Sequence, residues 1–155
     1  SEEKCEACLK LGADRAVNYK AEDFVKSVRD ATNGKGANVI LDMVGAPYFQ
    51  KNMAACALEG RIAQIAFQHG SKAELNMLPL MMRRLTWTGS TLRARPKSAK
   101  AAIAAALEAQ VWPKLASTPD ALRPHIHASF PLAEVTKAHQ MMEAGTHFGK
   151  IVLTL

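Results

Sequence analysis

Two cysteines near the start of the chain have the spacing of a metal-binding pair. Cys5 and Cys8 form a Cys-x-x-Cys motif, which supplies only half of a structural zinc site. No second pair accompanies them, and they lie in a helical pattern, where residues i and i+3 share one face. The motif therefore indicates two thiols on a helix and not a metal centre.

The histidines show no ligand spacing either. His125 and His127 alternate along an expected strand and so share a face, while His139 and His147 lie far along the chain. No carboxylate or cysteine accompanies them at the spacing that a zinc site uses. His69 could donate a proton, but no sequence partner is evident for it. We expect no metal site.

The glycines do not form a phosphate-binding loop. A dinucleotide-binding fold opens with a strand, a glycine-rich turn and a helix whose N-terminus receives the pyrophosphate. The sequence has no G-x-G-x-x-G, and Gly34-Lys35-Gly36 precedes a strand, which indicates a turn. The chain also opens with a helix, capped by Ser1. We therefore expect a piece of a longer fold whose sheet lacks its first two strands, leaving an edge that other residues must cover.

Short apolar runs alternate with helical segments along the whole chain. This order predicts an α/β fold with a parallel sheet and helices on both faces. The run over 38–44 is apolar on both faces, as in a central parallel strand. Further strands are expected over 15–19, 61–67, 85–90, 126–130 and 150–155. Helices are expected between Ser1 and Gly12 and over 22–32, 47–57, 76–84, 97–110 and 132–144, with a short helix and a loop over 112–120.

The bulk properties are those of an ordinary globular protein. The chain has 155 residues, of which 48% are hydrophobic and 22% charged. No apolar run reaches the roughly 18 residues that a membrane span requires. Three cysteines are an odd number without a disulfide framework, which favours a reducing compartment. We expect a cytoplasmic protein with no membrane partner.

The net charge of +6 raises the question of nucleic acid. Nucleic-acid binding requires basic residues clustered on one face. Here they are scattered, and the densest pair, Arg83-Arg84, lies beside apolar residues. We expect no nucleic-acid partner, since phosphate-bearing small molecules account for a mild basic excess equally well.

Five segments, in order, resemble a known family. They are Leu11-Gly-Ala-Asp-Arg-Ala-Val-Asn-Tyr19, Asn38-Val-Ile-Leu-Asp-Met-Val-Gly45, Leu58-Glu-Gly-Arg61, Ser90-Thr-Leu-Arg-Ala-Arg95 and Gly149-Lys-Ile-Val-Leu153. Together they are similar to the quinone oxidoreductase branch of the zinc-free medium-chain dehydrogenases, especially the p53-inducible type. The resemblance implies an incomplete Rossmann-type NADP-binding domain over 1–122. It also implies a C-terminal segment over 123–155 whose strands return to a GroES-like catalytic domain.

The resemblance implies NADPH as the cofactor. Ser1, Lys4 and Tyr19 stand where the family holds the adenosine 2′-phosphate. A hydroxyl, an ammonium at a helix N-terminus and a phenol can surround a dianion. No acidic residue occupies that position, where a carboxylate would favour the free 2′-hydroxyl of NADH. Without the resemblance, the alternative is a helix cap, a solvated charge and a strand-end aromatic residue.

The resemblance also places cofactor contacts at strand ends. Core packing competes with this role for Phe67 and Leu92. Gln68 and His69 depart from the small, glycine-rich residues that are expected after the strand over 61–67. Phe148 and Lys150 would approach the cofactor from the last strand. The full set is Val44, Gly45, Ala66, Phe67, Gln68, Thr91, Leu92, Arg93, Phe148 and Lys150.

The implied reaction is hydride transfer from NADPH to a quinone or another electron-poor enone, with the hydride coming from the cofactor. No residue is assigned as catalytic, and the chain alone is expected to turn over no quinone. One alternative is an assembly module without activity, which forms a homodimer through the edge of the strand over 85–90. Another is a self-sufficient α/β ligand-binding domain.

Overall fold

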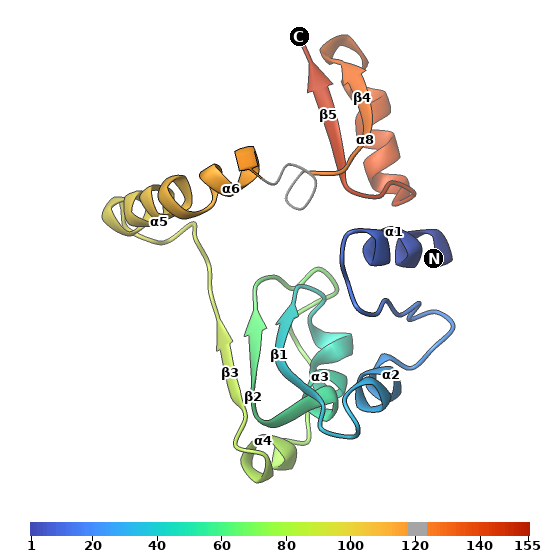
Figure 1. Ribbon diagram of the computed structural model, residues 1–155, viewed down its shortest axis with the longest axis vertical. Coiled ribbons are helices and arrows are strands. Elements are labelled where there is room, and N and C mark those ends of the chain that lie inside the picture. Colours follow the sequence, from blue (N-terminus) through green and yellow to red (C-terminus); the bar gives the residue numbers. More distant parts are fainter. Residues whose placement is uncertain (118–123) are drawn as a thin grey trace.

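Two parallel sheets organise the chain (Figure 1). The computed structural model describes residues 1–117 and 124–155. The larger sheet has the order β1 (Ala37–Asp42), β2 (Cys56–Gln64) and β3 (Thr86–Gly89). The smaller sheet pairs β4 (Ile126–Pro131) with β5 (Lys150–Thr154). The predicted α/β class with parallel strands and flanking helices is confirmed.

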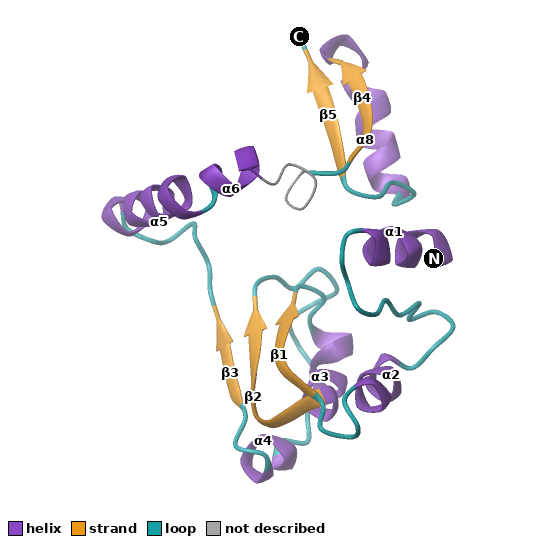
Figure 2. Cartoon of the chain, in the orientation of Figure 1, coloured by secondary structure: helices purple, strands orange, loops and turns teal. Residues whose placement is uncertain are grey.

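Two helices precede β1, and the other helices lie between successive strands, as the separate colours of Figure 2 show. Ser1 caps the first helix through its Oγ, which accepts a hydrogen bond from the Lys4 amide at 3.4 Å. The predicted helix over 97–110 is confirmed as α5, whereas the predicted domain boundary between 122 and 123 lies outside the described residues. The helices are α1 (Glu2–Lys10), α2 (Phe24–Ala31), α3 (Phe49–Ala55), α4 (Leu78–Met82), α5 (Lys97–Gln110), α6 (Trp112–Ser117) and α8 (Val135–Ala144), with 3₁₀ turns η1 (Ala46–Tyr48) and η2 (Leu132–Glu134).

The core lies between α3 and one face of the larger sheet. Phe49 of α3 packs edge-on against Trp87 of β3, with ring centroids 5.2 Å apart. Burying such apolar side chains is the main favourable contribution to folding. The buried centre consists of Met53, Cys56, Ile62 and Leu85.

Two arginines join α2 and α4 to the C-terminal end of α3. Arg29 and Arg83 both donate hydrogen bonds to the backbone carbonyls of Ala54 and Cys56. The last carbonyls of a helix lack intrahelical partners, and cationic donors there are favourable. These contacts therefore fix the position at which α3 passes into β2.

Among the described residues, the opposite face and both edges of the larger sheet are open. Val39 and Leu41 of β1 are each 61% exposed, because they point away from α3. β1 is also an edge strand, with β2 as its neighbour in the sheet. An apolar open edge of this kind is unusual in a self-contained domain.

The predicted strand over 15–19 is wrong. These residues are not in a strand, and none of the described strands pairs with them. An extended segment becomes a strand only when a neighbour accepts and donates its backbone hydrogen bonds. Val17 and Tyr19 have high strand propensity, but local propensity cannot supply that neighbour.

The strand predicted over 61–67 begins earlier and ends earlier, as β2. Gly60, between the predicted helix over 47–57 and the predicted strand, lies inside β2, at an irregularity in the pairing with β1. Glu59 adopts a left-handed φ of 58° there, and its amide donates to the Arg83 carbonyl. A side chain at Gly60 would collide with the Cys56 thiol. Gly60 thus permits a bulge where the sequence indicated a break.

Candidate functional site

Two neighbouring pockets contain five of the thirteen predicted site residues, and Tyr19 lines both of them. The first, which we call the basic pocket, has a volume of about 730 Å³ and lies between α1 and the segment 13–20. The second, the strand-end pocket, has a volume of about 700 Å³ and lies at the carboxyl end of β1. Ligands of open α/β sheets bind at such strand ends.

The basic pocket brings together the three residues predicted to hold a phosphate. Ser1, Lys4 and Tyr19 all line it, and Tyr19 is 64% exposed. Lys4 extends across the pocket mouth, and its Nζ donates a hydrogen bond of 3.1 Å to the carbonyl of Gly145. The side chain of Ser1 also serves as the helix cap, so both interpretations of this residue have a structural basis.

Two further cations of the basic pocket were missed. Arg15 and Lys20 line it as well, with Glu3 as an acidic member of the wall. Three cations against one carboxylate favour an anionic ligand, and the N-terminus of α1 adds a partial positive charge. Arg15 and Lys20 flank Tyr19 in the sequence, and this closeness was the available signal.

A buried aspartate shapes the strand-end pocket. Asp42 is 4% exposed, and its Oδ1 accepts hydrogen bonds from the amides of Val44 at 2.6 Å and Gly45 at 3.4 Å. Its Oδ2 accepts a third hydrogen bond, of 3.0 Å, from the side-chain amide of Asn52. Buried carboxylates require such donors. Asp42 therefore holds the Val44-Gly45 turn in place against α3.

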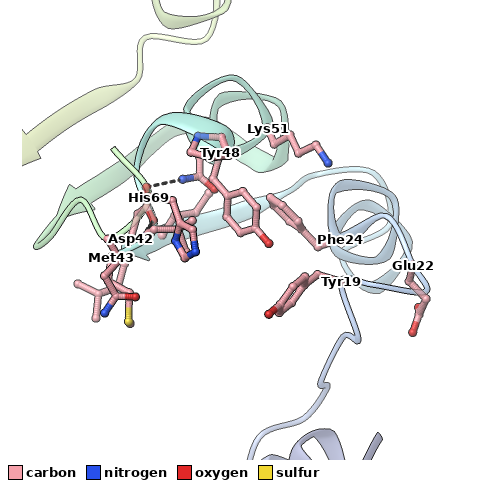
Figure 3. Close-up of a pocket in the computed structure, with 14 residues that line it drawn as sticks. Tyr19, Glu22, Phe24, Asp42, Met43, Tyr48, Lys51 and His69 are labelled. Atoms are coloured by element: carbon pink, nitrogen blue, oxygen red, sulfur yellow. Dashed lines mark hydrogen bonds between the residues drawn. The ribbon is translucent and has the colours of Figure 1, made fainter. Parts of the chain in front are cut away.

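Aromatic side chains form one wall of the strand-end pocket (Figure 3). The rings of Phe24 and Tyr48 lie 4.9 Å apart, with Tyr19 beside them, and Lys51 lies over the Phe24 ring. Burial raises the pKa of the Tyr48 hydroxyl above its ordinary value, with smaller contributions from Tyr19 and Asp42. Tyr48 is therefore a neutral phenol at physiological pH and can donate a hydrogen bond.

The loop after β2 closes the strand-end pocket from the other side. The amides of Gln68 and His69 donate to the carbonyls of Met43 and Val44, at 3.0 and 2.9 Å. Both side chains line the pocket, and His69 lies across from Tyr48 in Figure 3. The predicted residues Val44 and Gln68 are thus brought together here.

Two other predicted residues lie beside this pocket without lining it. The carbonyl of Ala66 accepts a hydrogen bond of 2.7 Å from Gln64. Phe67 packs edge-on against Phe49, with ring centroids 6.1 Å apart. Its Cα and ring lie close to Gly45. Phe67 is nevertheless 51% exposed, so one edge of its ring packs on the core residue Phe49 while the rest stays accessible.

The remaining predicted residues lie apart from both pockets. Thr91, Leu92 and Arg93 follow β3, where the Arg93 carbonyl accepts a hydrogen bond from Lys100. Phe148 packs on His125, with centroids 5.0 Å apart, and Lys150 begins β5. The structure therefore places the predicted residues in the basic pocket, around the turn after β1 and in two outlying segments.

Within residues 1–117 and 124–155, no group of three or more His, Cys, Asp or Glu side chains could hold a metal ion. No helix in the same ranges combines the length and the apolar character that crossing a membrane requires.

The match to a family model decides the relationship of the chain. Residues 11–153 match the model described as zinc-binding dehydrogenase. The chain belongs to the zinc-binding dehydrogenase family. The strand-end pocket lies entirely within the matched part. The α1 side of the basic pocket precedes it, with Ser1, Glu3, Lys4, Cys5 and Cys8.

Relatives with known names bear out the predicted relationship to quinone oxidoreductases. Quinone oxidoreductase-like protein 2 of Bos taurus is 26% identical, and the match covers 100% of the chain and 44% of that protein. The 2-haloacrylate reductase of a Burkholderia species is 27% identical, over 99% of the chain and 45% of that enzyme. The chain thus spans less than half the length of these zinc-binding dehydrogenase relatives.

Solved structures agree with this relationship. A mycobacterial protein complexed with NADPH superposes with a TM-score of 0.78 at 26% identity, covering 100% of the chain and 48% of that protein. An NAD-dependent alcohol dehydrogenase superposes with a TM-score of 0.77 at 34% identity, covering 100% of the chain and 42% of that protein. These two structures, each similar to the chain, are thus named with different cofactors, NADPH and NAD.

Proposed function

We propose that this chain is the cofactor-binding part of an NADPH-dependent oxidoreductase that reduces a quinone or another electron-poor enone. The observation that carries the proposal is the basic pocket, in which Lys4, Arg15 and Lys20 surround one space beside the N-terminus of α1. A 2′-phosphate dianion matches this arrangement, because charge-assisted hydrogen bonds from several cations are the strongest available to it.

The strand-end pocket would receive the rest of the adenosine. Tyr19 belongs to both pockets, so a ligand with its phosphate among the cations has its apolar portion beside the aromatic wall. Val44 and Gly45 would approach it at the carboxyl end of β1, with Asp42 fixing their amides. When NADPH is bound, its nicotinamide supplies the hydride.

The substrate class is supported by the names of the relatives. Quinones and 2-haloacrylate, which appear in those names, are both electron-poor alkenes. None of the side chains in the two pockets is proposed as an acid, a base or a nucleophile. Three free cysteines among the described residues support the cytoplasm as the compartment.

The cofactor proposal is tested by comparing two fragments of the nucleotide. We expect the chain to bind adenosine 2′,5′-bisphosphate at least about tenfold more tightly than adenosine 5′-monophosphate, because one charge-assisted phosphate contact contributes roughly 1.5–3 kcal/mol. Calorimetric titration measures both affinities. Added salt should weaken the binding of the bisphosphate more than the binding of the monophosphate. Equal affinities for the two nucleotides would contradict a 2′-phosphate site.

We also propose that β3 joins two copies into a homodimer. β3 has a free edge on the side away from β2, and a free edge presents unpaired backbone donors and acceptors. We expect sedimentation at micromolar concentration to show a dimer, which Thr88→Lys weakens because charged side chains discourage edge pairing. Ser98→Lys, on exposed α5, is the control. A monomer at every concentration would exclude this contact.

A further inference from the structure

The two cysteines of α1 lie in the wall of the basic pocket, where the proposed function gives them no role. Cys5 and Cys8 both line that pocket, together with Lys4 and Arg15. Both are half-buried free thiols. Residues three apart on a helix are neighbours on its surface. The pocket therefore presents two adjacent thiols next to the cations that would hold a phosphate.

We propose that Cys5 and Cys8 are a thiol-modification site that an anionic low-molecular-weight disulfide, such as oxidised glutathione, converts into an internal disulfide, which weakens phosphate binding in the basic pocket. The inference rests on the proposed function, because the phosphate ligand is part of it. The disulfide formed is reversible, so the pair links cofactor affinity to the redox state around the protein.

The chemistry balances as two successive thiol–disulfide exchanges. The thiolate of one cysteine attacks a sulfur of oxidised glutathione, whose S–S bond breaks and releases one glutathione thiolate. The second cysteine then attacks the protein sulfur of the mixed disulfide and releases the second glutathione thiolate. Two protein thiols are oxidised, one small disulfide is reduced, and the two thiol protons pass to the released thiolates. Lys4, Arg15 and Lys20 favour the first step, because they attract the carboxylates of glutathione.

Closing the disulfide must distort the first turns of α1. Cβ atoms three residues apart on a helix are about 5–6 Å apart, whereas a disulfide requires about 3.5–4.5 Å. The turn must therefore contract by roughly 1–2 Å. α1 has nine residues and buries none of them, so little packing resists this change. Lys4 directly precedes Cys5, so its Nζ would be displaced from the pocket and from the Gly145 carbonyl.

The same strain makes the disulfide easy to reduce. Strained or exposed disulfides have more oxidising potentials and are the labile, regulatory ones. Cys56 provides an internal contrast. Cys56 is 0% exposed. Burial raises the pKa of its thiol, and a backbone hydrogen bond at Ala57 and the charges of Arg83 and Arg29 oppose this shift only in part. We expect Cys56 to stay reduced under conditions that oxidise the α1 pair.

Mass spectrometry of the oxidised chain tests the thiol step. Lys4 and Lys10 bracket both cysteines, so trypsin releases them in one peptide, residues 5–10. After treatment with oxidised glutathione, we expect this peptide to lose two hydrogens and to resist alkylation, in the wild type and in Cys56→Ser. Cys5→Ser and Cys8→Ser should stop at the mixed disulfide and gain the mass of one glutathione. A peptide whose two thiols both remain alkylatable would overturn the proposal.

Titration with adenosine 2′,5′-bisphosphate tests the coupling. We expect oxidised chain to bind about tenfold more weakly than reduced chain, the effect of losing one charge-assisted contact, and reduction with a dithiol to restore the affinity. Unchanged affinity after complete disulfide formation would overturn the coupling. If reduced chain fails to bind the nucleotide, the proposed function fails and the coupling with it, whereas a peptide 5–10 that never oxidises refutes only the thiol site.

Discussion

Replacing Gly45 with alanine is expected to destabilise the fold by about 3 kcal/mol, a large fraction of a domain's stability. Gly45 has φ 96° and ψ −137°, a region that is costly for residues with a side chain. A Cβ there would also meet the Gly70 carbonyl and lie 3.2 Å from the Cα of Phe67. The Ala46 amide donates a hydrogen bond to that same Gly70 carbonyl, so the substitution would break this bond as well.

Gly34→Ala is the matched control for this prediction. Gly34 also has a positive φ, of 80°, but a Cβ there would meet nothing within 4 Å. The Gly34→Ala substitution should therefore lower the free energy of unfolding only by the backbone strain, about 1 kcal/mol. Urea unfolding measures both differences in the free energy of unfolding. Equal losses for the two variants would show that the contact between Gly45 and the loop over 67–70 is not important.

The order of helices and strands was predictable because it depends on local patterns. The apolar run over 38–44 and the alanine-rich segment over 97–110 give β1 and α5 at nearly the predicted positions. The segment over 15–19 shows where local patterns fail. Val17 and Tyr19 favour a strand, but strand formation depends on a neighbour distant in sequence. β2 shows the same limit, since it begins at Cys56, inside the predicted helix over 47–57, and the bulge at Gly60 lets the strand continue.

The candidate site was predictable only where a family motif covered it. Lys4 and Tyr19 follow from the resemblance, and the structure places them in one pocket. Arg15 and Lys20 were missed, because which side chains share a pocket with Lys4 depends on how α1 lies against the segment after it. Asp42 was also missed as an organising residue. Its role arises from three hydrogen bonds across a turn and a helix, which no spacing in the sequence specifies.

Removing cations from the basic pocket is expected to abolish the preference for a 2′-phosphate. Lys4→Met and Arg15→Met should each weaken binding of adenosine 2′,5′-bisphosphate about tenfold, because each removes one charge-assisted contact. The double variant should bind the bisphosphate roughly 100-fold more weakly than the wild type if the two contacts act independently. The affinity for adenosine 5′-monophosphate should stay unchanged in all three variants, because it lacks the phosphate that these side chains hold. Calorimetric titration of the four proteins gives every value.

Lys10→Met distinguishes loss of a phosphate contact from a general change of charge. Lys10 is on the same helix as Lys4 and carries the same charge, but it does not line the basic pocket. The Lys10→Met substitution should leave the affinities for the bisphosphate and the monophosphate unaltered, apart from a small change in the screened electrostatic attraction. Lys4 also donates to the Gly145 carbonyl, so thermal unfolding is measured alongside, and Lys4→Arg should retain the preference. If Lys10→Met weakens the bisphosphate as much as Lys4→Met, the pocket attracts anions through its overall field and contains no specific 2′-phosphate site.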